Sequence, residues 1–99
     1  MITIKYEIMI VLKEEFNNNE LKTWAFNHAK TLRKLSAAEI SVISRGKRNL
    51  AYLIENQKHG NFIQINFSTL PIYIKNFSKN LELDNDVLRF LILNKQLVN

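Results

Sequence analysis

Three cations and a glycine gather in the middle of this chain, where residues 44–54 read SRGKRNLAYLI. Arg45, Lys47 and Arg48 surround Gly46 and lead directly into an apolar run. A guanidinium can donate two hydrogen bonds to one phosphate, and lysine supplies a point charge. The cluster therefore indicates anion binding, with a sugar-phosphate backbone as a candidate ligand. The alternative is a solvated strand edge, whose charges prevent edge-to-edge pairing.

The composition favours a polyanionic partner. The 99 residues include 14 Lys+Arg and 9 Asp+Glu, which gives a formal charge of +5 and favours either a nucleic acid or an anionic membrane surface. No apolar run approaches the ~20 residues that span a bilayer, so we expect no membrane partner. The absence of cysteine excludes disulfides and thiolate metal sites, and a reducing compartment is expected.

Residues suited to catalysis or metal binding are sparse. His28 falls in an apolar helical stripe and His59 in a polar loop, without the spacing of a metal site. Asp84 and Asp86 could hold Mg²⁺, but a turn explains the pair better. The two glycines stand alone and form no phosphate-binding loop. We therefore predict no enzymatic activity, no cofactor, no metal and no small-molecule substrate.

The first half of the chain predicts a strand, a helix and a second strand. From Ile4 to Leu12, positions that hold only apolar or aromatic residues alternate with positions that hold both charged and apolar residues. This pattern is typical of a strand covered on one side. From Glu20 to Leu35, apolar residues recur at helical spacing after the capping run 17–19. Ile40 to Ile54 favour a long strand, with Gly46 as a bulge.

The second half predicts a hairpin loop, a strand, a helix and a final strand. In that order these are residues 57–61, 62–67, 70–81 and 87–93. We expect a hydroxyl of Ser68 or Thr69 to cap the helix, because Pro71 suits a first helical turn. Residues 84–86 end the helix. The last strand is apolar on both faces apart from Arg89, which predicts at least partial cover on both sides.

This β-α-β-β-α-β order predicts an α+β fold in a single domain, residues 1–99. It is typical of a ferredoxin-like fold, a four-stranded antiparallel sheet with both helices on one face. Right-handed crossovers place the first and third strands in the middle. The other sheet face then stays open, with six predicted residues on the two middle strands: Lys5, Glu7, Met9, Phe62, Gln64 and Asn66.

Three segments resemble the bacterial-type family of small-subunit ribosomal protein six. KYEI at residues 5–8 is similar to the family's first strand, GKRNLAY at 46–52 to its basic signature, and NLELDNDVLR at 80–89 to its entry into the last strand. The resemblance implies a ferredoxin-like fold without enzymatic activity. It also implies binding to the central domain of small-subunit ribosomal RNA, as a heterodimer with small-subunit ribosomal protein eighteen.

The resemblance implies roles for individual residues. Lys47 and Arg48 match the paired basic residues of the family signature, and Tyr52 matches its tyrosine. Arg45 stands where many members have a bulky residue, Leu53 where they have proline, and Glu82 where they commonly have arginine. Lys5 and Phe62 match the family more loosely. The expected RNA-binding residues are Lys5, Arg45, Lys47, Arg48, Tyr52, Phe62 and Arg89.

The sequence thus predicts a structural constituent of the small ribosomal subunit. Abundant Asn, Ile and Lys with few Gly and Pro indicate an AT-rich genome, so we expect a plastid ribosome, with the bacterial cytoplasm as the alternative. A rival interpretation is a ferredoxin-like protein-interaction or oligomerisation module without RNA binding. A small ligand-binding regulatory domain is a third, weakened by the shortage of glycine at strand ends.

Overall fold

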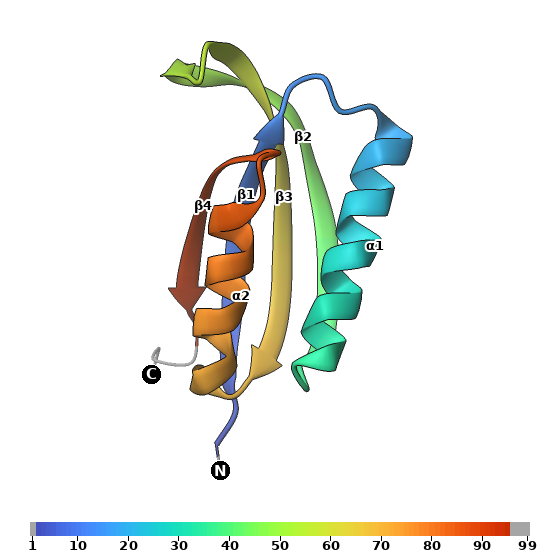
Figure 1. Ribbon diagram of the computed structural model, residues 1–99, viewed down its shortest axis with the longest axis vertical. Helices are drawn as coiled ribbons and strands as arrows, with labels where there is room; N and C mark the ends of the chain where they lie inside the picture. Colours follow the sequence, from blue (N-terminus) through green and yellow to red (C-terminus); the bar gives the residue numbers. More distant parts are fainter. Residues whose placement is uncertain (1, 96–99) are drawn as a thin grey trace.

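The computed structural model describes residues 2–95 and contains six helices and strands. They are β1 (Ile4–Lys13), α1 (Asn18–Lys34), β2 (Ala38–Ile54), β3 (Gln57–Thr69), α2 (Pro71–Leu83) and β4 (Val87–Asn94). The strands form one antiparallel sheet in the order β2-β3-β1-β4. Both helices lie on one face of this sheet (Figure 1). The ferredoxin-like prediction is confirmed, including the central position of the first and third strands.

The core lies between the sheet and the two helices. Alternate residues of β1 and β3 point toward the helices, because successive side chains of a strand point to opposite faces. Burial of a large apolar side chain stabilises a fold by about 1.5–3 kcal/mol, so this layer supplies most of the favourable free energy. Its buried members are Tyr6, Ile8, Ile10, Leu12, Trp24, Leu32, Ile63, Ile65, Phe67, Phe77 and Leu81.

Asn17 begins α1 with a reciprocal pair of hydrogen bonds. Its side chain accepts from the Glu20 amide at 2.8 Å, and the Glu20 carboxylate accepts from the Asn17 amide at 2.9 Å. We expect Asn17→Ala to lower the free energy of unfolding by about 1 kcal/mol, because amides of the first turn lose their acceptor. Urea denaturation measures this change. Asn19→Ala is the control, and a loss of equal size there would contradict the capping role.

A hydrogen bond joins α1 to the end of α2. Trp24 Nε1 donates to Asp84 Oδ2 at 2.9 Å, and the other oxygen of Asp84 accepts from the Asp86 amide, also at 2.9 Å. The predicted turn at residues 84–86 is confirmed. His28 stacks on the Trp24 ring with 3.7 Å between centroids. The aspartate therefore ends one helix and holds the indole of the other.

The predicted hairpin loop at residues 57–61 is wrong. The turn consists of Glu55 and Asn56, whose φ angles of 48° and 65° suit a two-residue hairpin turn, and β3 begins at Gln57. Gly60 lies within β3 for a packing reason. A Cβ atom built on it would come within 2.4 Å of Val11 Cγ1. The glycine makes room for a neighbouring strand and does not form a turn.

The predicted hydroxyl cap of the second helix is also wrong. Leu70 occupies the cap position and makes no side-chain hydrogen bond there, whereas Pro71 begins α2 as expected. Ser68 and Thr69 are buried at the end of β3. The Thr69 hydroxyl donates to the Leu35 carbonyl at 3.4 Å, so it links β3 to the end of α1.

The last strand is not covered on both faces, contrary to prediction. β4 is an edge strand that pairs only with β1 within the described residues. Phe90 and Ile92 pack against the core, but Leu91 and Leu93 are 59% and 39% exposed on the open face. An apolar residue in a strand has the same sequence signature whether the chain buries it in its own core or exposes it on the open face of the sheet.

Candidate nucleic-acid interface

A β-bulge positions the first cation of the central cluster. Two residues of β2, Arg45 and Gly46, lie opposite the single Phe62 of β3, and Gly46 has a φ of +87°, which favours glycine. The predicted bulge is confirmed. The Arg45 guanidinium lies against Gln64, whose Oε1 accepts from Nε at 3.0 Å and from Nη2 at 2.6 Å. These contacts fix Arg45 on the open face of the sheet.

Arg48 lies beside Arg45 and is held by two contacts. Its Nε donates to the Arg45 carbonyl at 3.2 Å, and its guanidinium carbon lies 5.8 Å from the centre of the Phe62 ring. A cation over an aromatic face is attracted by the ring quadrupole. Both arginines remain exposed. Since contacts within the protein already hold them, an anion would bind at a smaller cost in side-chain entropy.

The β2–β3 hairpin continues beyond the sheet as an arm, residues 48–59. The last β1 pair is Lys13 with Gly60, so the arm has no third strand beside it. Its register shifts between Asn49 and Ile54, and the arm bends toward the β4 side (Figure 1). The bend brings Tyr52, 61% exposed, to Arg89 of β4, whose guanidinium carbon lies 5.5 Å from the ring centre.

These contacts define the basic sheet end, which consists of Arg45, Arg48, Tyr52, Phe62 and Arg89. The five residues come from β2, β3 and β4 and lie where the arm leaves the sheet. One guanidinium group lies over each of the two aromatic rings. The surface therefore presents three exposed arginines that the protein itself orients, which suits an extended polyanion better than a small ligand.

Two residues of the expected set lie apart from the basic sheet end. Lys47 pairs with Asn61, and the alternation of side chains along a strand directs it away from the face of Arg48. Lys5 pairs with Ser68 at the other end of β1. It lies six residues from Val11, the partner of Phe62, or roughly 20 Å along the strand. The structure therefore does not bring Lys5 or Lys47 into the cluster.

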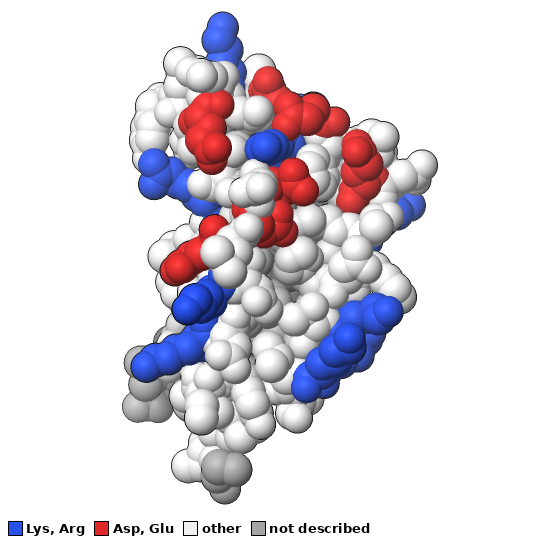
Figure 2. Space-filling model, viewed as in Figure 1, with Lys and Arg blue, Asp and Glu red and all other residues white. Residues whose placement is uncertain are grey.

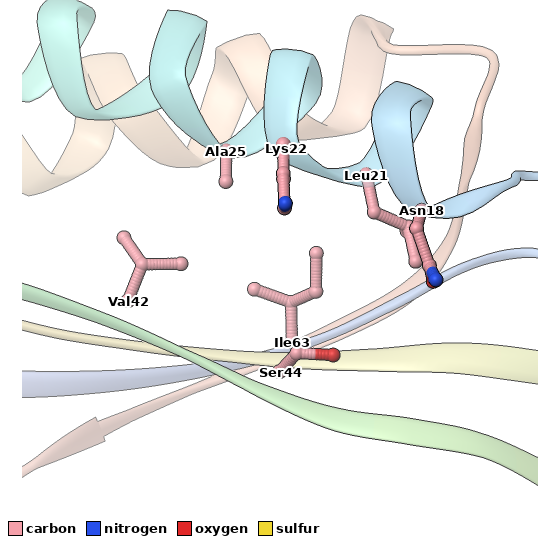
Figure 3. Close-up of a pocket in the computed structure, with 7 residues that line it drawn as sticks. All are labelled: Asn18, Leu21, Lys22, Ala25, Val42, Ser44 and Ile63. Carbon is pink, nitrogen blue, oxygen red and sulfur yellow. The ribbon is translucent and has the colours of Figure 1, made fainter.

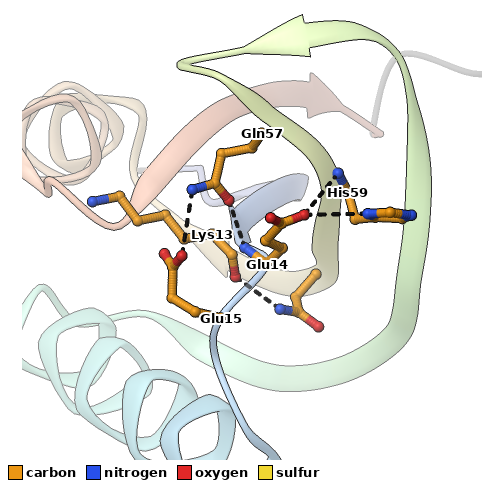
Figure 4. Close-up of polar contacts among 6 residues, drawn as sticks. Lys13, Glu14, Glu15, Gln57 and His59 are labelled. Carbon is orange, nitrogen blue, oxygen red and sulfur yellow. Dashed lines mark hydrogen bonds and ion pairs between the residues drawn. The ribbon is translucent and has the colours of Figure 1, made fainter.

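A polar clasp, Glu14 with Gln57 and His59, holds the root of the arm (Figure 4). Glu14 Oε2 accepts from the His59 amide at 3.1 Å and lies 3.2 Å from His59 Nδ1. The Glu14 amide donates to Gln57 Oε1 at 2.8 Å. Sequence reasoning missed this clasp. The available signal was the carboxylate pair, Glu14 and Glu15, immediately after the first strand.

We expect Glu14→Ala to loosen the arm without unfolding the core. Two contacts to His59 disappear, at a cost of about 1 kcal/mol for a partly exposed group. Hydrogen exchange at the His59 amide should become about fivefold faster, while exchange at Ile8 in the core stays unchanged. Glu15→Ala is the matched control, because Glu15 accepts only a 3.4 Å bond from Gln57. Equal effects of both variants would contradict the clasp.

A groove between α1 and β2 has a volume of about 360 Å³ (Figure 3). It is lined by Asn18, Leu21, Lys22, Ala25, Val42, Ser44 and Ile63. Lys22 is the one titratable residue among these, and none of the expected RNA-binding residues lines the groove. A lone hydroxyl and a lone amine without a partnered base do not form a nucleophilic site.

Two further observations concern residues 2–95. They contain no group of three or more His, Cys, Asp or Glu side chains that could hold a metal ion. Neither helix in this part of the chain is long and apolar enough to cross a membrane.

The fold and the basic sheet end together define a ferredoxin-like domain with an exposed cationic surface. A solved structure shares this fold. The crystal structure of 30S ribosomal protein S6 from Thermotoga maritima matches with a TM-score of 0.86, covering 95% of this chain and 89% of that one. At 17% sequence identity, the likeness shows the fold alone.

Sequence comparisons then show the family. The family model described as ribosomal protein S6 matches residues 5–94. Small ribosomal subunit protein bS6c of Trieres chinensis is 75% identical over 94% of this chain and 97% of that protein. The bS6c protein of Phaeodactylum tricornutum is 68% identical over 94% of this chain and 95% of that protein. The chain belongs to the ribosomal protein S6 family, which confirms the family predicted from its sequence motifs.

Proposed function

We propose that the chain is a structural constituent of the small ribosomal subunit of a plastid, where it binds the central domain of the ribosomal RNA together with ribosomal protein S18. Family membership supports the ribosomal role. Relatives named bS6c, at 75% and 68% identity, support a plastid better than a bacterial cytoplasm, because bacterial relatives named bS6 match at about 30%. The role is assembly, without a chemical reaction.

One observation carries the RNA-binding proposal, the orientation of three arginines in the basic sheet end. Arg45, Arg48 and Arg89 are exposed, and Gln64, Phe62 and Tyr52 respectively hold them. Arginine forks grip phosphate oxygens by paired hydrogen bonds. The aromatic rings orient the guanidinium groups, so their main role in this arrangement is to support cations. Lys47 adds charge on the opposite face of the sheet, and Lys5 adds charge at the far end of β1 on the open face.

Apolar residues of the open face suit the protein partner. Leu91 and Leu93 of β4 are exposed beside Met9 of β1, with which Leu91 pairs. This apolar strip lies across the sheet from β2, the strand of Arg45 and Arg48. We assign the strip to S18 and the basic sheet end to RNA. Each partner then covers a surface of matching chemistry.

The test is RNA binding with and without the partner protein. The wild-type chain and S18 together should bind a central-domain RNA fragment more tightly than either protein alone, with an affinity that falls steeply as salt rises. Tagged chain expressed in plastids should sediment with small ribosomal subunits. Absence from that fraction, or binding that is insensitive to salt, would contradict the proposal.

The second candidate is an oligomerisation module, favoured by the exposed Leu91 and Leu93. In that case two copies would pair their apolar strips. Light scattering at several concentrations separates the two functions. A stable homodimer that ignores both RNA and S18 would support the module.

A further inference from the structure

The outward face of α1 is a second cationic surface. At 100° per residue, eight exposed side chains of this helix fall within about 140° of arc. We call this set the α1 basic face: Asn19, Lys22, Thr23, Phe26, Asn27, Lys30, Arg33 and Lys34. Every residue of α1 is described, and this arc holds four cations, whereas the exposed carboxylate of Glu20 in the first turn lies about 20° beyond its edge. Its remaining members offer amides, a hydroxyl and one aromatic ring.

A solvated helix surface explains part of this pattern but not all of it. Arg33 and Lys34 lie in the last turn, where cations favourably oppose the helix dipole. Lys22 and Lys30 lie outside that turn. The other helix shows the ordinary pattern, because Lys75 and Lys79 share their face with the following Glu82. On α1 the one exposed carboxylate, Glu20, lies in the first turn at the edge of the arc, so no acidic residue stands among the four cations of the α1 basic face.

Phe26 is the second observation that points to a ligand. Its side chain is 60% exposed and lies outside the buried stripe of α1, which consists of Trp24, Ala29 and Leu32. Lys30 Nζ lies 5.7 Å from the ring centre. An exposed ring gains little from burial and contributes little to the core. Beside cations, such a ring suits stacking with an unpaired base.

The α1 basic face and the basic sheet end lie on opposite sides of the sheet. α1 covers the helix-side face, whereas Arg45 and Arg48 lie on the open face. Figure 2 shows the helix side, with cations over the C-terminal half of α1 and most carboxylates in the upper part of the view. One RNA strand cannot follow both surfaces without passing around the molecule.

We propose that the α1 basic face binds a second segment of RNA, distinct from the segment at the basic sheet end. Lys30, Arg33 and Lys34 contact phosphates, Lys22 extends the track toward the α1–β2 groove, and an unpaired base packs on Phe26. This inference rests on the proposed function and gives the protein a bridging role between two RNA segments.

A salt series tests the phosphate contacts. Wild-type chain with S18 is titrated onto full-length small-subunit ribosomal RNA at several salt concentrations. The double variant Lys30→Gln with Arg33→Gln should lower the slope of log affinity against log salt by roughly 1.4 to 1.8. Lys75→Gln with Lys79→Gln on α2 removes the same charge and should leave the slope unchanged. Equal slopes for the α1 variant and wild type overturn the inference, as does an equal loss for both double variants.

Phe26→Ala tests the stacked base. We expect about a 5- to 150-fold loss of affinity with an unchanged salt slope, because stacking releases no counterions. The exposed ring contributes little to the core, so misfolding should not explain the loss. Unchanged affinity would overturn the assignment of Phe26.

Lysine acetylation of intact small subunits provides a direct comparison. Lys22 and Lys30 should be protected relative to the free protein, while Lys75 and Lys79 react at similar rates in both states. Cross-links from Lys30 should reach nucleotides, and cross-links to a protein instead would overturn the RNA assignment. If α1 variants bind normally while a basic sheet end variant fails, the inference falls but the proposed function stands. If the wild type binds no RNA, both fall.

Discussion

Charge reversal at Arg45 and Arg48 together is expected to lower the affinity for central-domain ribosomal RNA by about a hundredfold. Each arginine is placed to make one charge-assisted contact worth about 1.5 kcal/mol, and 1.4 kcal/mol corresponds to a factor of ten. The salt slope should fall by roughly 1.4 to 1.8, because two phosphates are no longer neutralised. Fluorescence anisotropy of labelled RNA at several salt concentrations measures both quantities for Arg45→Glu with Arg48→Glu.

Two comparisons sharpen this experiment. Lys75→Glu with Lys79→Glu on α2 changes the net charge by the same amount, away from the basic sheet end, and should have a much smaller effect. Lys47→Glu tests the importance of position within β2. Because Lys47 points to the other face, Lys47→Glu should lower the RNA affinity less than Arg48→Glu does. If all variants lose affinity in proportion to charge alone, the protein attracts RNA without the contacts assigned to these arginines.

Removal of the Phe77 ring is expected to lower the free energy of unfolding by about 3–5 kcal/mol. Phe77 of α2 is fully buried, and it meets the Phe67 ring of β3 edge-on at 6.0 Å between centroids. Truncation leaves a cavity between helix and sheet. Since single domains are stable by about 5–15 kcal/mol, Phe77→Ala removes a large share of the total. Urea unfolding, followed through the single tryptophan at Trp24, measures the loss.

Phe26→Ala is the matched control for Phe77→Ala. The same ring is removed from the same type of element, but the Phe26 side chain is exposed, so the expected change is within about 0.5 kcal/mol. A large destabilisation by Phe26→Ala would show that α1 depends on this ring for folding. A small effect of Phe77→Ala would contradict the position of the core between the sheet and α2.

Periodicity predicted most of the fold because burial in this protein is one-sided. Alternation in β1 matches a strand with one face toward the helices, and the predicted helix from Glu20 to Leu35 agrees closely with Asn18–Lys34. Packing between distant segments was not predictable in this way. Gly60 looks like a turn residue in sequence, but Val11, far away in the chain, occupies the space of its missing side chain.

The residue types of the candidate site were predictable, but their arrangement was not. A cluster of cations beside a glycine is visible in sequence, and Gly46 does form the bulge that places Arg45. The contact between Tyr52 and Arg89 depends on the register shift and bend of the arm, which no local pattern encodes. Lys5 shared the predicted open face, yet position along the strand separates it from the cluster.

A structure of the assembled small subunit, with this chain in place, would show directly whether the arginines of the basic sheet end bind RNA. We expect guanidinium nitrogens of Arg45 and Arg48 to lie within about 3 Å of phosphate oxygens, as charge-assisted hydrogen bonds require. Their contacts with Gln64 and Phe62 should persist in the complex. Side chains of both arginines pointing into bulk water, away from any nucleotide, would contradict this expectation.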